Sequence, residues 1–125
     1  MSLLLDTHVL LWWLGKDSRL GTPAKDAIAD PETLVTVSVM SAWEISIKVA
    51  LGKLNAPGDL PAQLERHSFA TLLVDLDHAL LAGSLPLHHT DPFDRMLVAQ
   101  AQLERLTIVT RDPRFSQYDV EVLAA

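Results

Sequence analysis

The sequence predicts an α/β fold: a three-layer α/β/α sandwich around a central, mostly parallel sheet of four to five strands. Short apolar segments alternate along the chain with longer segments whose apolar residues recur at helical spacing. Pro follows Thr or Asp at several expected helix starts. Strands that alternate with helices form parallel sheets covered on both faces, which suits a chain that is 49% hydrophobic.

The N-terminal part of the chain predicts one strand and two helices. Residues 2–5 form a short apolar run that ends at Asp6, as expected of a fully buried strand. Residues 9–14 are apolar and precede a Gly, which indicates a helix. A second helix is expected over residues 22–29, with Thr22 as its N-cap and Pro at the first helical position.

The middle of the chain predicts another strand and two more helices. Residues 34–37 are apolar and β-branched, which favours a strand. Residues 38–51 follow as a helix with Ser38 as its N-cap. The stretch 55–61 is rich in turn residues, and residues 60–67 form a weaker helix.

The C-terminal half repeats the alternation. We expect a strand over residues 70–74 and a helix over residues 77–84. A longer helix is expected over residues 92–105, with Asp91 as its N-cap and Pro92 at its first position. The remaining expected strands are residues 107–110 and 120–122.

Composition limits the class of protein. The 125 residues fit a single domain, 1–125. The chain has no Cys, which excludes disulfides and thiolate sites and is compatible with a cytoplasmic location. It has neither a basic leader nor a run of about 18 apolar residues, so we expect no signal peptide and no membrane span. A net charge of −6 disfavours nucleic-acid binding, unless the acids are gathered around cations.

Four acids are expected at one edge of the sheet. Asp6 ends the first strand, and Asp112 lies two residues beyond the fourth. Asp94 lies in the first turn of the helix before that fourth strand, and Glu44 lies in the helix after the second strand. Sites in parallel α/β sheets lie at the carboxyl ends of the strands, where these four side chains can converge.

Converging carboxylates suit hard cations. Mg²⁺ and Mn²⁺ prefer oxygen ligands, and two such ions can activate water and stabilise the leaving oxygen in phosphodiester cleavage. Each acid also has a purely structural interpretation. Asp6, Asp91 and Asp112 stand where helix caps stand, and Ser41 to Glu44 matches a capping box. We assign only Asp91 a capping role.

Several aromatic and imidazole side chains are weaker candidates. Trp12 and Trp13 are adjacent and cannot both face inward, so one is expected to be exposed or in an interface. His88 and His89 are possible metal ligands, but a loop pair without a third partner is expected to be solvated. His8 is assigned no role.

Three basic residues adjoin candidate acids or share a face with them. Lys48 lies one turn after Glu44, where it either forms an i,i+4 ion pair or contacts a phosphate. Arg95 and Arg111 either contact RNA backbone or balance the neighbouring charge.

Four segments, in order, resemble the PIN domain family and, within it, the VapC-type toxin ribonucleases. They cover nearly the whole chain and are Leu3–His8, Ser41–Lys48 with Leu51–Leu54, His89–Ala101 and Thr110–Phe115. The third, which contains Thr90-Asp91-Pro92-Phe93-Asp94-Arg95, is the most recognisable. The order and spacing of all four make the resemblance specific.

The resemblance implies a PIN-like fold and metal-dependent cleavage of RNA within the strand. By position it implies that Asp6, Glu44, Asp94 and Asp112 form the catalytic site and hold Mg²⁺ or Mn²⁺. It also implies a homodimer and an antitoxin protein as partner. Asp112 is the acid whose role varies most across the family.

Two alternatives remain open. One is a PIN-like binding or regulatory module without nuclease activity. The other is a receiver-like signalling domain, which would have an acidic pair after its first strand and a lysine after its last. Here Thr7 and His8 follow Asp6, and residues 120–125 contain no lysine.

Overall fold

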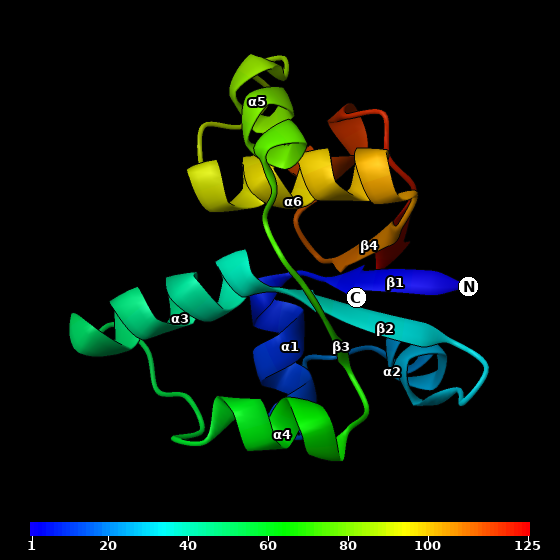
Figure 1. Ribbon diagram of the computed structural model, residues 1–125. Coiled ribbons are helices and arrows are strands. Elements are labelled where there is room, and N and C mark those ends of the chain that lie inside the picture. Colours follow the sequence, from blue (N-terminus) through cyan, green and yellow to red (C-terminus); the bar gives the residue numbers. More distant parts are fainter.

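The computed structural model describes residues 1–125 and contains five strands, six α-helices and one 3₁₀ helix (Figure 1). The strands are β1 (Ser2–Leu5), β2 (Leu34–Ser38), β3 (Ala70–Leu72), β4 (Thr107–Thr110) and β5 (Val122–Ala124). The helices are α1 (Thr7–Leu14), α2 (Thr22–Ala29), α3 (Val39–Ala50), α4 (Leu60–Arg66), α5 (Leu76–Ser84) and α6 (Pro92–Glu104), with the 3₁₀ helix η1 (Pro113–Gln117).

The strands form one sheet in the order β3-β2-β1-β4-β5, and all four pairings are parallel. The predicted α/β fold with a parallel sheet is therefore confirmed. A receiver-like sheet has the order 2-1-3-4-5, so the topology excludes that alternative. No helix has the length and apolar character needed to cross a membrane.

Helices cover both faces of the sheet: α1, α2 and α4 lie on one side, and α5 and α6 on the other (Figure 1). Side chains alternate between the faces of a strand. Leu3 and Leu5 accordingly pack into one core cluster with Val9, while Leu4 packs into the other with Leu97. All three leucines are fully buried, as a central strand covered on both faces requires.

Polar N-caps begin the three helices nearest the predicted site. Asp6, Ser38 and Asp91 each accept a hydrogen bond from the backbone N–H two residues later, at 3.0, 3.0 and 2.9 Å. These bonds satisfy donors that have no partner within the helix. The predicted cap of α2 is wrong: Gly21 occupies the N-cap without a side-chain bond, and Thr22 is already helical.

The C-terminal region differs most from expectation. β5 occupies Val122–Ala124 rather than residues 120–122. The N–H of Val120 donates to the Tyr118 carbonyl in a turn, so pairing with β4 begins only at Val122. Residues 113–117 form the 3₁₀ helix η1, which the sequence pattern did not assign. Earlier in the chain, β3 ends at Leu72 rather than at residue 74.

Candidate metal centre

Asp6 combines a capping role with a place at the carboxyl edge of the sheet. Its Oδ1 accepts the His8 N–H, and its Oδ2 accepts the Thr110 hydroxyl at 2.5 Å. Thr110 is the last residue of β4, which pairs with β1, so the sheet itself brings the two side chains together. Burial raises the pKa of the Asp6 carboxyl above its usual value, against the two hydrogen bonds.

Glu44 projects from α3 into the same region and is 4% exposed. Its Oε1 accepts the Thr7 hydroxyl at 2.7 Å, and its Oε2 lies 2.5 Å from Lys48 Nζ. The i,i+4 pair with Lys48 is thus present, and the hydrogen bond raises the pKa of Lys48. The capping-box interpretation of Glu44 is wrong, because Ser38 caps α3.

Asp94 lies in the first turn of α6, three residues after the N-cap Asp91. Of the four predicted acids it alone accepts no hydrogen bond. Burial, and then the negative charges of Asp91, Asp6, Glu44 and Asp112, raise the pKa of Asp94 to about 8. Burial is the larger cause, and the carboxylates lie close enough that their negative charges add to it.

Asp112 follows β4 and is the N-cap of η1, where its Oδ1 accepts the Arg114 N–H at 2.9 Å. The Arg114 guanidinium also bonds both carboxylate oxygens, at 2.7 to 3.2 Å. These bonds hold the pKa of Asp112 well below its usual range. Asp112 is thus a cap and a member of the cluster, but it is already paired with a cation.

His89 is the residue that sequence reasoning missed. It was expected to be solvated, yet it is 3% exposed, and its Nε2 lies 3.2 Å from Asp94 Oδ2 and 3.3 Å from Asp112 Oδ2. One sequence signal was available. Asp91 and Pro92 mark the start of α6, so His89, two residues before Asp91, is expected close to the first turn of that helix. The second partner is 23 residues away in sequence and gives no local signal.

The four predicted acids line one hollow of about 320 Å³ at the carboxyl edge of the sheet. Its wall also contains cationic and aromatic side chains, and the complete lining is Asp6, His8, Val9, Trp12, Glu44, Lys48, Asp91, Asp94, Arg111, Asp112 and Arg114. The structure thus brings together all four acids: the N-caps of α1 and η1, and one residue each of α3 and α6.

A family model described as PIN domain matches residues 3–121 of this chain. The chain belongs to the PIN domain family. By sequence this PIN domain is similar to Ribonuclease VapC22 of Mycobacterium tuberculosis (strain ATCC 25618 / H37Rv). The two are 25% identical over 120 residues, which cover 94% of this chain and 92% of VapC22.

Solved structures support the same fold. The PIN domain is similar to VapBC2 from Rickettsia felis bound to a DNA fragment from its promoter, with a TM-score of 0.69 and 14% identity over 99% of this chain and 98% of that chain. It is also similar to FitAcB from Neisseria gonorrhoeae, with a TM-score of 0.65 and 23% identity over 97% of this chain and 96% of that chain.

Arg95 of the PIN domain has neither of its two predicted roles. Its guanidinium is buried and donates to the backbone carbonyls of Ala82, Leu85, Pro86 and His89 at 2.9 to 3.2 Å. It therefore ties the end of α5 to the loop that precedes α6. An arginine so occupied cannot reach a substrate.

Arg111 differs from Arg95 in that it lines the hollow. Its guanidinium donates to the carbonyls of Arg19 and Ala125, and its central carbon lies 4.7 Å from the Trp12 ring centroid, a cation–π distance. Of the adjacent tryptophans, Trp12 faces the hollow and Trp13 packs on Phe69. Both are half-buried, so neither is exposed, and a place in an interface stays a prediction.

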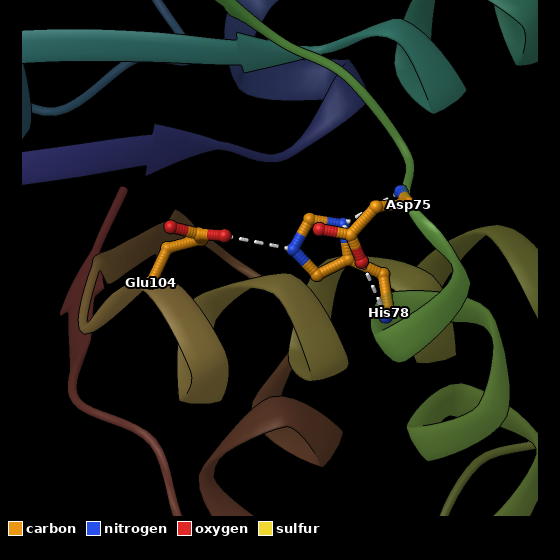
Figure 2. Close-up of side chains that lie close together, drawn as sticks. All are labelled: Asp75, His78 and Glu104. Atoms are coloured by element: carbon orange, nitrogen blue, oxygen red, sulfur yellow. Dashed lines mark hydrogen bonds and ion pairs between the residues drawn. The ribbon is translucent and has the colours of Figure 1, made fainter.

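A second histidine with two carboxylates lies between α5 and α6 (Figure 2). The Asp75 carboxylate accepts the His78 N–H at 2.9 Å, and His78 Nδ1 accepts the Asp75 N–H at 3.1 Å, so the pair forms a reciprocal cap of α5. His78 Nε2 lies 3.0 Å from Glu104 Oε1 near the end of α6. Both ring nitrogens therefore have partners: Nδ1 completes the cap of α5, and Nε2 joins α5 to α6.

The hollow has the donor set of a hard divalent cation. Its possible ligands are mainly carboxylate oxygens, and Asp94 accepts no hydrogen bond and is paired with neither Lys nor Arg, its nearest polar neighbour being His89 Nε2 at 3.2 Å. Ligand atoms of His89, Asp94 and Asp112 lie within 4.8 Å of one another. A bound cation would relieve the repulsion on Asp94. These acidic residues can accordingly hold a metal.

Proposed function

We propose that this PIN domain is a metal-dependent endoribonuclease that acts as the toxin of a toxin–antitoxin pair. The observation that carries the proposal is the convergence of Asp6, Glu44, Asp94 and Asp112 on one hollow, with Asp94 left without a hydrogen bond or a cation. The likeness to a relative named as a ribonuclease supports RNA as the substrate.

In this proposal the four acids hold Mg²⁺ or Mn²⁺. When bound there, such an ion would supply charge stabilisation and would activate a water molecule. Asp94 would be the principal ligand, since it accepts no side-chain or cap hydrogen bond and is not paired with Lys or Arg; its one close polar neighbour is His89 Nε2 at 3.2 Å. Thr7 and Thr110 orient Glu44 and Asp6 through hydrogen bonds of 2.7 and 2.5 Å.

The cations around the hollow suit a phosphodiester substrate. Lys48, Arg111 and Arg114 line it alongside the acids, although the chain as a whole carries a net charge of −6. Lys48 and Arg114 are each paired with an acid, at 2.5 and 2.7 Å. A metal on those acids would free both side chains to contact substrate phosphates.

The partners of the proposed toxin follow from its relatives. Solved structures of similar fold include a toxin–antitoxin complex from Klebsiella pneumoniae, with a TM-score of 0.64 and 20% identity over 96% of this chain and 94% of that chain. We accordingly assign this PIN domain a cognate antitoxin that blocks the hollow, and a homodimeric state. An RNA-cleaving toxin restrained in this way would act in the cytoplasm.

The test is cleavage of a mixed pool of structured RNAs by the purified protein with Mg²⁺, with Mn²⁺ and with EDTA. Cuts that require metal and disappear in Asp94→Asn support the nuclease. Cuts that persist in EDTA or in the variant contradict the assignment. A protein that is folded and binds metal but cuts no RNA in the pool favours the binding-module alternative.

A further inference from the structure

His89 is held rigidly although it belongs to no helix or strand. Its carbonyl accepts hydrogen bonds from Arg95 Nη1 at 3.2 Å and from the Tyr118 hydroxyl at 3.5 Å. Its ring lies 5.6 Å from the Phe115 ring, centroid to centroid. Backbone and ring are thus fixed from α6, from η1 and from the residue that follows η1.

The fixed ring presents one nitrogen to two acids. Nε2 hydrogen-bonds Asp112 Oδ2 at 3.3 Å and lies 3.2 Å from Asp94 Oδ2, while Nδ1 makes no hydrogen bond. A neutral imidazole has one N–H, so the tautomer that satisfies the ring carries its hydrogen on Nε2. In that form the Nε2–H donates to Asp112, lies beside Asp94 Oδ2, and leaves Nε2 no lone pair for a metal.

When Asp94 and Asp112 are both ionised, as metal ligands are, their oxygens near Nε2 repel each other unless a cation or the positive end of an N–H dipole lies between them. The Arg114 side chain bonds Asp112 but makes no bond to Asp94. The Nε2–H of His89 is the only donor group within 3.3 Å of both. It therefore draws the first turn of α6 and the start of η1 toward each other at the hollow.

We propose that His89 is a positioning residue of the metal centre: through Nε2 it holds the Asp94 and Asp112 carboxylates at the spacing that binds the cation. The inference rests on the proposed function, because it takes the acidic hollow as the metal site. It predicts that metal affinity depends on His89 although His89 is not a ligand. Groups that orient ligands in this way contribute about tenfold to hundredfold to metal affinity.

The test measures Mn²⁺ affinity by electron paramagnetic resonance of the free ion, for the full chain and three variants. His89→Ala removes the N–H, and His89→Gln keeps an amide N–H near the position of Nε2. His88→Ala is the matched control, because the adjacent His88 is exposed and its ring contacts only Tyr118 among the aromatics. RNA cleavage is measured in parallel on the same samples.

We expect His89→Ala to weaken Mn²⁺ binding by about tenfold or more, His89→Gln to restore most of the affinity, and His88→Ala to leave it unchanged. In an Asp112→Ala background, His89→Ala should weaken binding by a smaller factor, because one of its two partners is gone. A purely structural role predicts instead that the Mn²⁺ affinity of His89→Ala, corrected for the folded fraction, equals that of the wild type.

Three results overturn the proposal. One is wild-type affinity in folded His89→Ala. The second is imidazole nitrogen coupling to bound Mn²⁺ in the wild type that disappears in His89→Gln, which would make His89 a direct ligand. The third is a folded wild type that binds no Mn²⁺. Binding that depends on His89 without any RNA cleavage leaves the positioning role standing and removes the nuclease.

Discussion

The protein contains two groups of one histidine and two carboxylates, which differ in position and in the exposure of their acids. Asp75, His78 and Glu104 join α5 to α6, with acid side chains that are 60% and 43% exposed (Figure 2). His89, Asp94 and Asp112 lie at the carboxyl edge of the sheet, with acid side chains that are 18% and 23% exposed.

The surroundings make the difference. The acids around His78 each meet the ring and solvent, and every ring nitrogen has a partner. Asp94 instead is buried beside Asp6, Glu44, Asp91 and Asp112, so the fold does not compensate the charge of its ionised form, and its pKa is raised. Proximity of possible ligands is therefore a weak sign of a metal site. Charge that the fold leaves uncompensated is a stronger one.

The largest expected difference between the two groups is in RNA cleavage. Asp94→Asn should lower the metal-dependent rate by about a thousandfold, because it removes charge where the cation is held. Glu104→Gln, the matched change in the other group, should stay within about twofold, as do surface substitutions away from a site. Initial rates on the most rapidly cut RNA of the pool measure both. Equal losses of cleavage rate in Asp94→Asn and Glu104→Gln would contradict the proposed difference between the two groups.

The next expected difference is in how the free energy of unfolding of the metal-free protein depends on pH. The pKa of Asp94 is about 8 in the folded protein against an ordinary value of 3.8 for an Asp side chain. Between those values the folded state binds a proton that the unfolded state lacks, so the free energy of unfolding falls as pH rises. The raised pKa of Asp6 acts in the same direction, whereas the lowered pKa of Asp112 acts only at more acidic pH.

In EDTA, the melting temperature should therefore fall by several degrees from about pH 5 to about pH 8. Mn²⁺ should restore it at the higher pH, and Asp94→Asn should flatten the profile and melt above the wild type. Calorimetry on the wild type, Asp94→Asn and Asp75→Asn measures this. An Asp94→Asn protein that melts below the wild type in EDTA would favour a capping role for Asp94.

A smaller effect is expected at the helix junction. His78→Ala removes the acceptor for the Asp75 N–H and the contact with Glu104 from a side chain that is 1% exposed. It should lower the free energy of unfolding by about 2 kcal/mol, without altering Mn²⁺ affinity. Urea unfolding in EDTA measures the first quantity. A loss of Mn²⁺ affinity in folded His78→Ala would make this group a metal site as well.

The smallest effect is expected from the exposed cap itself. Asp75→Ala should cost about 1 kcal/mol and Asp75→Asn only a few tenths, because Asn caps helices nearly as well as Asp. Cleavage should be unchanged in both variants. The same urea titration measures the two costs. Both variants keep the backbone N–H of residue 75 that bonds His78 Nδ1. Equally small costs for Asn and Ala would therefore mean that this backbone bond, rather than the side-chain cap, carries the stabilisation.

The sequence by itself determined what depends on near neighbours. Strand and helix order follow from apolar periodicity, and the starts at Ser38 and Asp91 follow from cap bonds that span two residues. Asp6, Asp94 and Asp112 were found because they lie near a predicted strand end or a helix start, and Glu44 because it lies in the helix after the second strand; parallel strands bring such positions to one edge.

Only the tertiary structure decided the partners of those acids. Asp6 meets Thr110 across 104 residues, Glu44 meets Thr7 across 37, and Asp112 meets His89 across 23. The Arg95 guanidinium donates to backbone carbonyls rather than to a phosphate, because the end of α5 and the loop before α6 pack against it. Such contacts leave no local pattern, since packing of distant segments sets the spacing. The sequence therefore named the acids, and the fold decided which of them is left without compensation.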